Sequence, residues 1–276
     1  MYKKTILDNG LRILTETMPH TRSVSVAIFL GAGSRYESEQ ESGAAHFIEH
    51  MLFKGTRGRP NAHEVCQPIE AVGGVLNGGT DKELTIYWCK VASQHFDLAL
   101  DVLADMVLES KFDPAEMDKE RQVIIEEINM SLDSPQSQVG LLIDEVVWPD
   151  QPLGWDVAGN KATVSQMSRD NLLDFMGQMY RPKNALVSVA GNIDHEQAVR
   201  SIARGLGRWQ DAPVRSWSPA KEAQRSPRVK VAARPAEQAH LCLALRGVSY
   251  MHPDRFAHDL LNVVLGEGMT SRLFLE

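Results

Sequence analysis

Hydrophobic and polar residues alternate in short runs along several parts of the chain, a pattern typical of β-strands. The runs KKTIL and LRILTE are joined by Asp8-Asn9-Gly10, a strong turn signal, and together they predict a hairpin. Further strands are predicted at residues 23–31, 75–80, 83–91 and 185–191.

Longer stretches with apolar residues three and four positions apart predict helices between these strands. They cover the region of residues 43–56, then 61–72, 93–110, 114–131, 135–147, 165–180 and 194–206. Asp113-Pro114 supplies a capping residue and a first-turn proline for one of them. The alternation of antiparallel hairpins with helices predicts an α+β fold, with a mixed, largely antiparallel sheet packed against helices.

The composition changes at residues 210–228, which are rich in proline, serine, alanine and charged residues. This change predicts an interdomain linker after a first domain at residues 1–209. Beyond it, VKVAARP (229–235) and AHLCLALRGVS (239–249) predict new strands, and residues 255–266 predict a helix. Because residues 229–276 are too few to bury a core, we expect them to be the incomplete beginning of a second domain.

Composition narrows the class of protein. The 276 residues are 43% hydrophobic and 24% charged, as in ordinary globular proteins, and the net charge is −7. This acidic balance argues against nucleic acid or an anionic membrane as a partner. The sequence offers no apolar run of membrane-spanning length and no signal-peptide core at its start, so we expect a cytoplasmic location. Cys66, Cys89 and Cys242 form no C-x-x-C pair, which disfavours both a disulfide framework and a cysteine metal site.

The stretch GAAHFIEHMLFKGT, residues 43–56, places two histidines and a glutamate in an apolar helical pattern. His46 and His50 are four residues apart and Glu49 lies beside them, so all three crowd one edge of a helix. Two imidazoles at this spacing can bind one metal ion while the adjacent carboxylate reaches a water on it. H-x-x-E-H is the inverted form of the zinc-protease motif, and burying these groups without a partner would be costly.

A zinc ion held by two histidines needs one more protein ligand. The acidic candidates lie in MDKERQVIIEEINM, residues 117–130. In a helix, Glu120 and Glu127 are seven residues apart and border the apolar face, whereas Glu126 points toward solvent. An exposed charge is the default for any one of them, but the histidine motif makes Glu127 the favoured ligand.

The sequence resembles the pitrilysin-type inverzincin metallopeptidases, in particular the bacterial relatives of mitochondrial processing peptidase. The resemblance rests on HFIEHMLFKGT, GGVLNGGTDKELTIYW, ERQVIIEEI, VSVAGNI and GEGMTSRLF, which occur in the family's order. It implies His46, His50 and Glu127 as zinc ligands and Glu49 as the general base. It also implies that Glu120 orients a histidine and that Asn77 contacts the substrate backbone.

The resemblance implies a zinc endopeptidase that hydrolyses peptides or unfolded presequence-like segments, with residues 1–209 as the catalytic half of a clam-like enzyme. Gly78-Gly79 stand where relatives usually have bulkier residues, which indicates a more open substrate pocket. Full-length relatives have two similar halves, so we expect this chain to need a second homologous half or a partner subunit. The alternative is a non-catalytic partner or scaffold subunit of the same fold.

Other catalytic motifs are absent from the sequence. Gly31-Ala32-Gly33 follows a predicted strand, but Tyr36 stands where a dinucleotide-binding loop needs its third glycine. Neither the phosphate-binding G-x-x-x-x-G-K-[ST] nor the serine-nucleophile G-x-S-x-G occurs.

Overall fold

The computed structural model describes residues 2–222, 224–235 and 237–276. Its contacts divide the chain into two compact units, Met1–His240 and Leu241–Glu276. The division expected from the sequence, with a linker at 210–228, stays a prediction.

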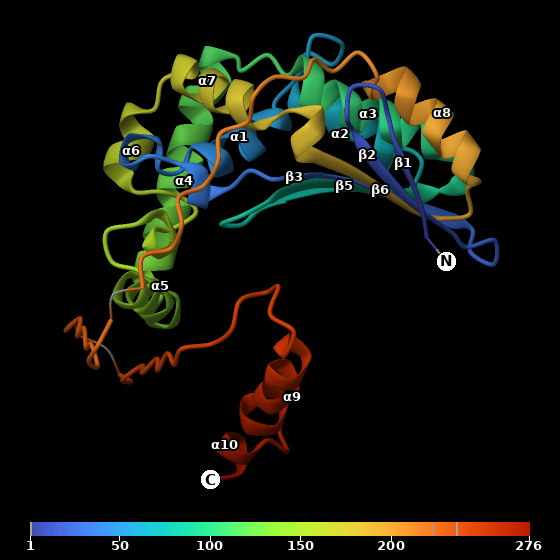
Figure 1. Cartoon of the computed structure of the whole chain (residues 1–276). Coiled ribbons are helices and arrows are strands. Elements are labelled where there is room, and N and C mark those ends of the chain that lie inside the picture. Colours follow the sequence, from blue (N-terminus) through green and yellow to red (C-terminus); the bar gives the residue numbers. More distant parts are fainter. Residues whose placement is uncertain (1, 223, 236) are drawn as a thin grey trace. The chain divides into compact units, whose positions relative to one another are not determined.

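The larger unit is built on one sheet, which has six strands within the described residues (Figure 1). They are β1 (Lys3–Ile6), β2 (Arg12–Thr17), β3 (Ser23–Leu30), β4 (Val75–Thr80), β5 (Thr85–Ala92) and β6 (Ala185–Gly191). In space their order is β1-β2-β6-β3-β5-β4, so β4 lies at one edge. Neighbouring strands are antiparallel except β2 and β6, which are parallel. The predicted mixed, largely antiparallel sheet is therefore confirmed.

Four helices of the described chain pack against one face of this sheet, namely α1 (Ala44–Leu52), α2 (Ala62–Glu70), α3 (Phe96–Glu109) and α8 (His195–Leu206). Four others contact mainly other helices, namely α4 (Pro114–Asp133), α5 (Pro135–Val147), α6 (Lys161–Gln166) and α7 (Arg169–Met179). Figure 1 shows α1, α2, α3 and α8 on the same side of the strands. Along β3, every second residue from Val24 to Leu30 is buried, because alternate side chains point toward the helices.

The helix predicted at residues 165–180 is observed as α7, but it begins four residues later than predicted. α6 ends at Gln166, and α7 begins at Arg169 after Ser168, whose side chain accepts a hydrogen bond from the Asn171 N–H. The start was misplaced because this serine caps a new helix just after α6 ends.

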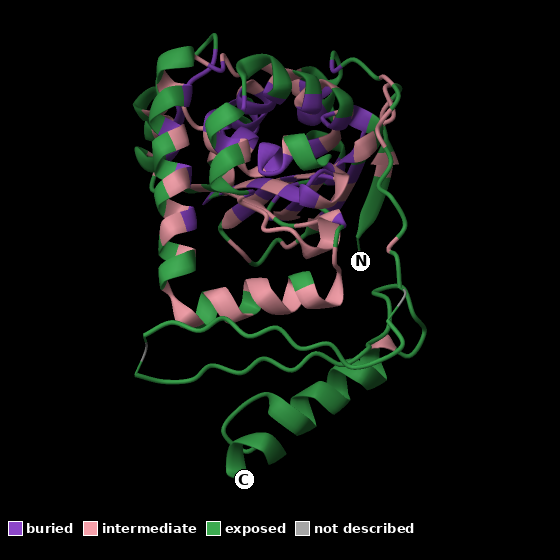
Figure 2. Cartoon of the chain, turned by 90° about the vertical axis from the view of Figure 1, so that its left-hand side faces the viewer, coloured by how far each residue is buried: buried purple, intermediate pink, exposed green. Residues whose placement is uncertain are grey.

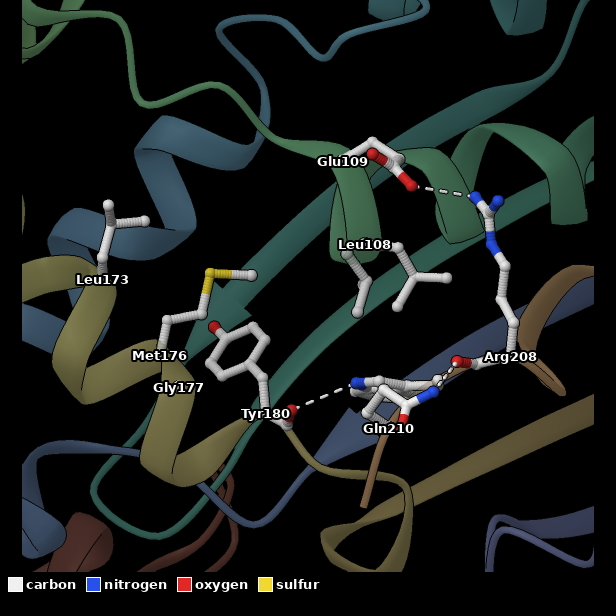
Figure 3. A pocket seen from close by; sticks show the side chains of 10 residues that line it. Leu108, Glu109, Leu173, Met176, Gly177, Tyr180, Arg208 and Gln210 are labelled. Atoms are coloured by element: carbon white, nitrogen blue, oxygen red, sulfur yellow. Dashed lines mark hydrogen bonds and ion pairs between the residues drawn. The ribbon is translucent and has the colours of Figure 1, made fainter. Parts of the chain in front are cut away.

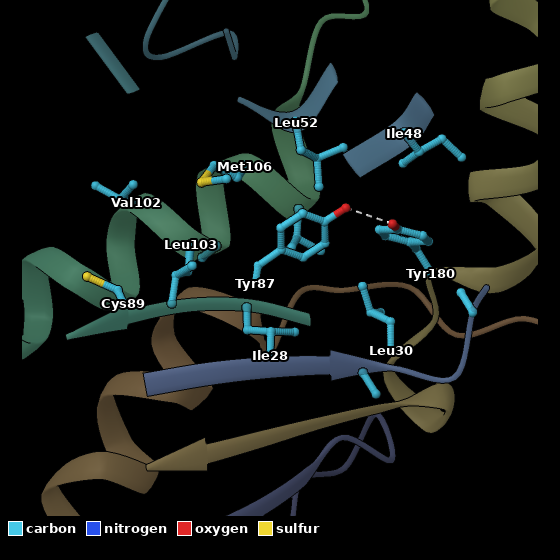
Figure 4. Close-up of a cluster of buried hydrophobic side chains, with 14 of the residues drawn as sticks. Ile28, Leu30, Ile48, Leu52, Tyr87, Cys89, Val102, Leu103, Met106 and Tyr180 are labelled. Atoms are coloured by element: carbon cyan, nitrogen blue, oxygen red, sulfur yellow. Dashed lines mark hydrogen bonds between the residues drawn. The ribbon is translucent and has the colours of Figure 1, made fainter. Parts of the chain in front are cut away.

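The core lies between the sheet and the helices (Figure 2). Part of it is drawn in Figure 4, where Ile48 and Leu52 of α1 lie above Ile28 and Leu30 of β3. At its centre the hydroxyls of Tyr87 and Tyr180 form a buried hydrogen bond of 2.9 Å. Buried hydroxyls need such a partner, so this pair fixes how β5 meets the end of α7.

The smaller unit contains the predicted helix, as α9 (Arg255–Gly266), and a short α10 (Arg272–Leu275). The strands predicted at 229–235 and 239–249 are wrong, since these residues form no strand and are exposed. A β-type sequence becomes a strand only when a neighbouring strand takes up its hydrogen bonds, and none pairs with it in the described part of the chain. α9 is exposed almost throughout (Figure 2).

Candidate metal centre

The motif helix α1 is held by its apolar residues, which leaves its polar edge open. Six of its nine residues are buried, namely Ala44, Ala45, Phe47, Ile48, Met51 and Leu52. His46, Glu49 and His50 are only partly buried. Because α1 contacts the edge strand β4 and also α4 and α7, its position is fixed by elements distant in sequence.

The start of α1 is shaped by Gly43 and Glu37. Gly43 adopts a left-handed conformation, with φ of 96°, and an added Cβ would lie 2.7 Å from the carbonyl oxygen of Ala158. The buried Glu37 carboxylate accepts hydrogen bonds from the Gly43 and Ala45 N–H groups, each at 2.8 Å. These bonds satisfy N–H groups at the helix start that have no partner within the helix.

His46, His50 and Glu127 converge, each offering an atom within 4.8 Å of the others. Glu127 Oε2 lies 3.8 Å from His46 Nε2 and 3.5 Å from His50 Nε2. The two rings stand nearly perpendicular, with centroids 4.7 Å apart. Glu126 is exposed, as the helical period predicted. The structure therefore brings together the three predicted ligands, whose assignment as ligands stays a prediction.

The cluster fits a zinc ion in both geometry and chemistry. Ligand atoms about 2 Å from a tetrahedral zinc lie roughly 3.3 Å apart, close to the separations here. Burial, with a smaller contribution from His50, lowers the pKa of His46 to about 4, so its imidazole is neutral at pH 7. His46 Nδ1 is buried and has no hydrogen-bond partner among the described residues. The other ring nitrogen, Nε2, faces Glu127 and is the atom that could bind a metal.

The imidazole of His50 is oriented by Glu120, which contacts the ring nitrogen that does not face Glu127. Its Nδ1 lies 3.0 Å from Glu120 Oε2, which assigns the proton to Nδ1 and leaves the Nε2 lone pair facing Glu127. The ammonium of Lys54 lies 2.7 Å from the other Glu120 oxygen. Burial would raise the pKa of the Glu120 carboxyl, but the hydrogen bonds from His50 and Lys54 outweigh it and lower the pKa below its usual value. Glu120 is thus held as a carboxylate beside His50.

Glu49 lies on the same edge of α1 and contacts β4. Its Oε2 accepts a hydrogen bond of 2.6 Å from the Thr80 hydroxyl. Burial raises the pKa of the Glu49 carboxyl; the Thr80 hydrogen bond and His50 offset part of this rise, and Glu127 adds to it. A carboxylate whose pKa is raised is a stronger base than a free one, which suits Glu49 to accept and release a proton beside the cluster.

Asn77 is exposed on β4, and its amide oxygen accepts a hydrogen bond from the Gly78 N–H. It is three residues from Thr80, so their side chains point to opposite faces of the strand. Its contact with substrate stays a prediction.

A groove among the described residues lies away from these side chains. It has a volume of about 440 Å³ and lies between the ends of α3 and α7 and residues 208–210 (Figure 3). Glu109 and Arg208 form an ion pair across its rim. None of the predicted site residues lines it, so its size does not make it the reaction site.

Comparison with known proteins decides the family. Residues 12–161 match Insulinase (Peptidase family M16), and residues 166–276 match the Peptidase M16 inactive domain. The chain belongs to peptidase family M16.

Curated relatives of this M16 chain are named zinc proteases. It is 39% identical over 278 aligned residues to an uncharacterized zinc protease of Mycobacterium leprae, covering 99% of this chain and 62% of the relative. It is 36% identical to an uncharacterized zinc protease of Bacillus subtilis, covering 99% of this chain and 66% of the relative. The chain thus spans less than two thirds of the length of these relatives.

Solved structures agree with the fold of this M16 chain. A protease from Helicobacter pylori superposes with a TM-score of 0.85 at 23% identity, covering all of this chain and 68% of that one. An M16 inactive domain from Pseudomonas fluorescens gives a TM-score of 0.83 at 18% identity, covering all of this chain and 67% of that one. No helix in the described parts of this M16 chain combines the length and the apolar character that a membrane crossing requires.

Sequence reasoning missed two contributors to this M16 site, Lys54 and Thr80. Lys54 follows His50 by four residues, so helical spacing could have placed it near Glu120. No comparable signal identified Thr80, because its contact with Glu49 joins a strand to a helix 31 residues away.

Proposed function

We propose that this chain is a zinc-dependent endopeptidase that hydrolyses peptides or unfolded presequence-like segments. The observation that carries the proposal is the convergence of His46, His50 and Glu127 on one side of α1, with Glu49 beside them. Membership of family M16 and the names of the curated relatives support it.

The chemistry follows from the position of each group. A zinc ion held by His46, His50 and Glu127 would supply Lewis-acid chemistry, polarising a peptide carbonyl and lowering the pKa of water. Glu49 accepts a proton from the attacking water and passes it to the leaving amine. Glu120 keeps the proton of His50 on Nδ1, so that Nε2 is free to bind.

Substrate binding is proposed along β4. This strand forms an edge of the sheet, so its outward N–H and C=O groups can pair with an extended peptide. Such pairing gives affinity through main-chain bonds and demands little of the peptide sequence. Asn77 is exposed on this strand, and its side chain is proposed to contact the peptide backbone.

Efficient cleavage is proposed to require a second homologous half or a partner subunit. The chain spans less than two thirds of its curated relatives, and the apolar residues of α9, such as Phe256 and Leu260, are exposed. Exposed apolar surface of this kind favours association. A closed site would also exclude water and could add groups that stabilise the developing oxyanion.

The ligand assignment is tested by zinc content. We expect about one zinc per chain, a strong loss of zinc in Glu127→Gln, and none in the matched control Glu126→Gln, which alters an exposed neighbour. Metal analysis after dialysis measures both. Equal losses in the two variants, or no loss in either, would show that Glu127 is not a ligand.

The catalytic assignment is tested by Glu49→Gln. If Glu49 is the base, this variant keeps its zinc and loses cleavage of an unstructured peptide, both alone and with a second half supplied. Loss of zinc instead would make Glu49 a ligand. Wild-type chain that binds zinc yet cleaves nothing in either form would favour the non-catalytic subunit.

A further inference from the structure

The hydroxyl of Thr80 is the one side-chain donor that hydrogen-bonds to the Glu49 carboxylate within the described residues. Thr80 is the last residue of β4 and pairs in register with Thr85 of β5, so its backbone position is fixed by the sheet. The bond occupies Oε2 of Glu49 and leaves Oε1 available to accept a proton.

A second residue of β4, Gly78, allows this contact. Gly78 and Thr80 are two residues apart and therefore face the same side of the strand. A Cβ added to Gly78 would lie 3.0 Å from the Phe53 ring and 3.3 Å from Glu49 Cγ. The lack of a side chain lets β4 approach α1 closely, which brings the Thr80 hydroxyl within reach of Glu49.

Threonine is common in strands, so the alternative is that Thr80 only stabilises the strand. Strand propensity needs only its branched Cβ, however, and it does not require the hydroxyl to bond with a carboxylate on another element. Glu49 has three flexible side-chain torsions, and holding one carboxylate orientation among many requires a partner. A mobile general base would spend only part of its time in line with the attacking water.

We propose that Thr80 is a positioning residue for Glu49. Its hydroxyl fixes one oxygen of the carboxylate so that the other is presented to the water whose proton it takes. Thr80 itself exchanges no proton and touches no substrate. The effect of Thr80 on catalysis rests on the proposed function. The orientation of Glu49 can be observed without any activity.

The kinetic test compares Thr80→Val, which keeps the branched shape and removes the hydroxyl, with Thr80→Ser, which keeps the hydroxyl. In the form of the enzyme that cleaves peptide, we expect Thr80→Val to lower kcat about 10- to 100-fold while KM and zinc content stay near wild type. Thr80→Ser should retain most of kcat. Equal losses in both variants, or no loss in Thr80→Val, would overturn the proposal.

The structural test uses the metal-free chain. Crystal structures should show one Glu49 orientation in the wild type and in Thr80→Ser, and a displaced or multiply oriented carboxylate in Thr80→Val. An unmoved Glu49 in Thr80→Val would overturn the positioning role whatever the activity. A wild-type enzyme that cleaves nothing would overturn the proposed function and leave this structural result standing.

Discussion

Protonation of the buried Glu37 is expected to make the stability of this protein depend on pH. Glu37 is only 4% exposed, and its two carboxyl oxygens accept hydrogen bonds from the Gly43 and Ala45 N–H groups at the start of α1. Burial raises its pKa from 4.5 to about 8, although the two backbone hydrogen bonds offset part of the rise. Between these values the folded chain holds a proton that the unfolded chain has released. The contribution of Glu37 to folding stability is therefore largest below pH 4.5 and falls as the pH rises to 8.

The size of the effect follows from the two pKa values. A rise from 4.5 to about 8 corresponds to about 5 kcal/mol across the whole window. The slope from this one group would reach about 1.4 kcal/mol per pH unit. Glu37→Gln cannot ionise and should lose this slope. At low pH the variant should be less stable by about 1–3 kcal/mol, since its amide cannot accept from both N–H groups.

The assay is urea unfolding of metal-free protein at several values between pH 5.5 and 7.5, because bound zinc would add its own pH dependence. The matched control is Glu39→Gln, which removes an exposed carboxylate from the same loop and should keep the wild-type slope. Parallel stability curves for wild type and Glu37→Gln would show that Glu37 does not cause the pH dependence.

Two further predictions concern the start of α1 and the segment of residues 210–222. Gly43→Ala should lower the free energy of unfolding by about 1–3 kcal/mol in thermal unfolding, because Gly43 has a positive φ and no room for a Cβ. The control Gly140→Ala, at an open helical position, should be neutral or stabilising. Equal destabilisation in both variants would show that the conformation of Gly43 is not the cause. Arg215→Met removes a two-pronged bond to Glu41, so residues 210–222 should be cut faster in limited proteolysis. The exposed Arg225→Met is its control, and equal cutting rates would show that Arg215 does not hold the segment.

Local pattern in the sequence determined much of this protein. The hairpin at residues 3–17, the capped start of α4 at Asp113 and Pro114, and the single polar edge of α1 all follow from periods and turns that act over a few residues. The same helical period predicted that Glu127 borders the buried face of α4 while Glu126 is exposed. These features need no knowledge of distant contacts, because backbone geometry alone sets which side chains share a face.

Tertiary structure decided what lies beside those faces. Glu120 reaches His50 across 70 residues and Thr80 reaches Glu49 across 31, and no local pattern specifies either contact. The strands predicted at 229–235 and 239–249 failed for the same reason, since a strand exists only through its partner. The sequence alone determines which groups each helix or strand can present, whereas burial and proximity, which set hydrogen bonds and pKa values, arise only when those elements pack together.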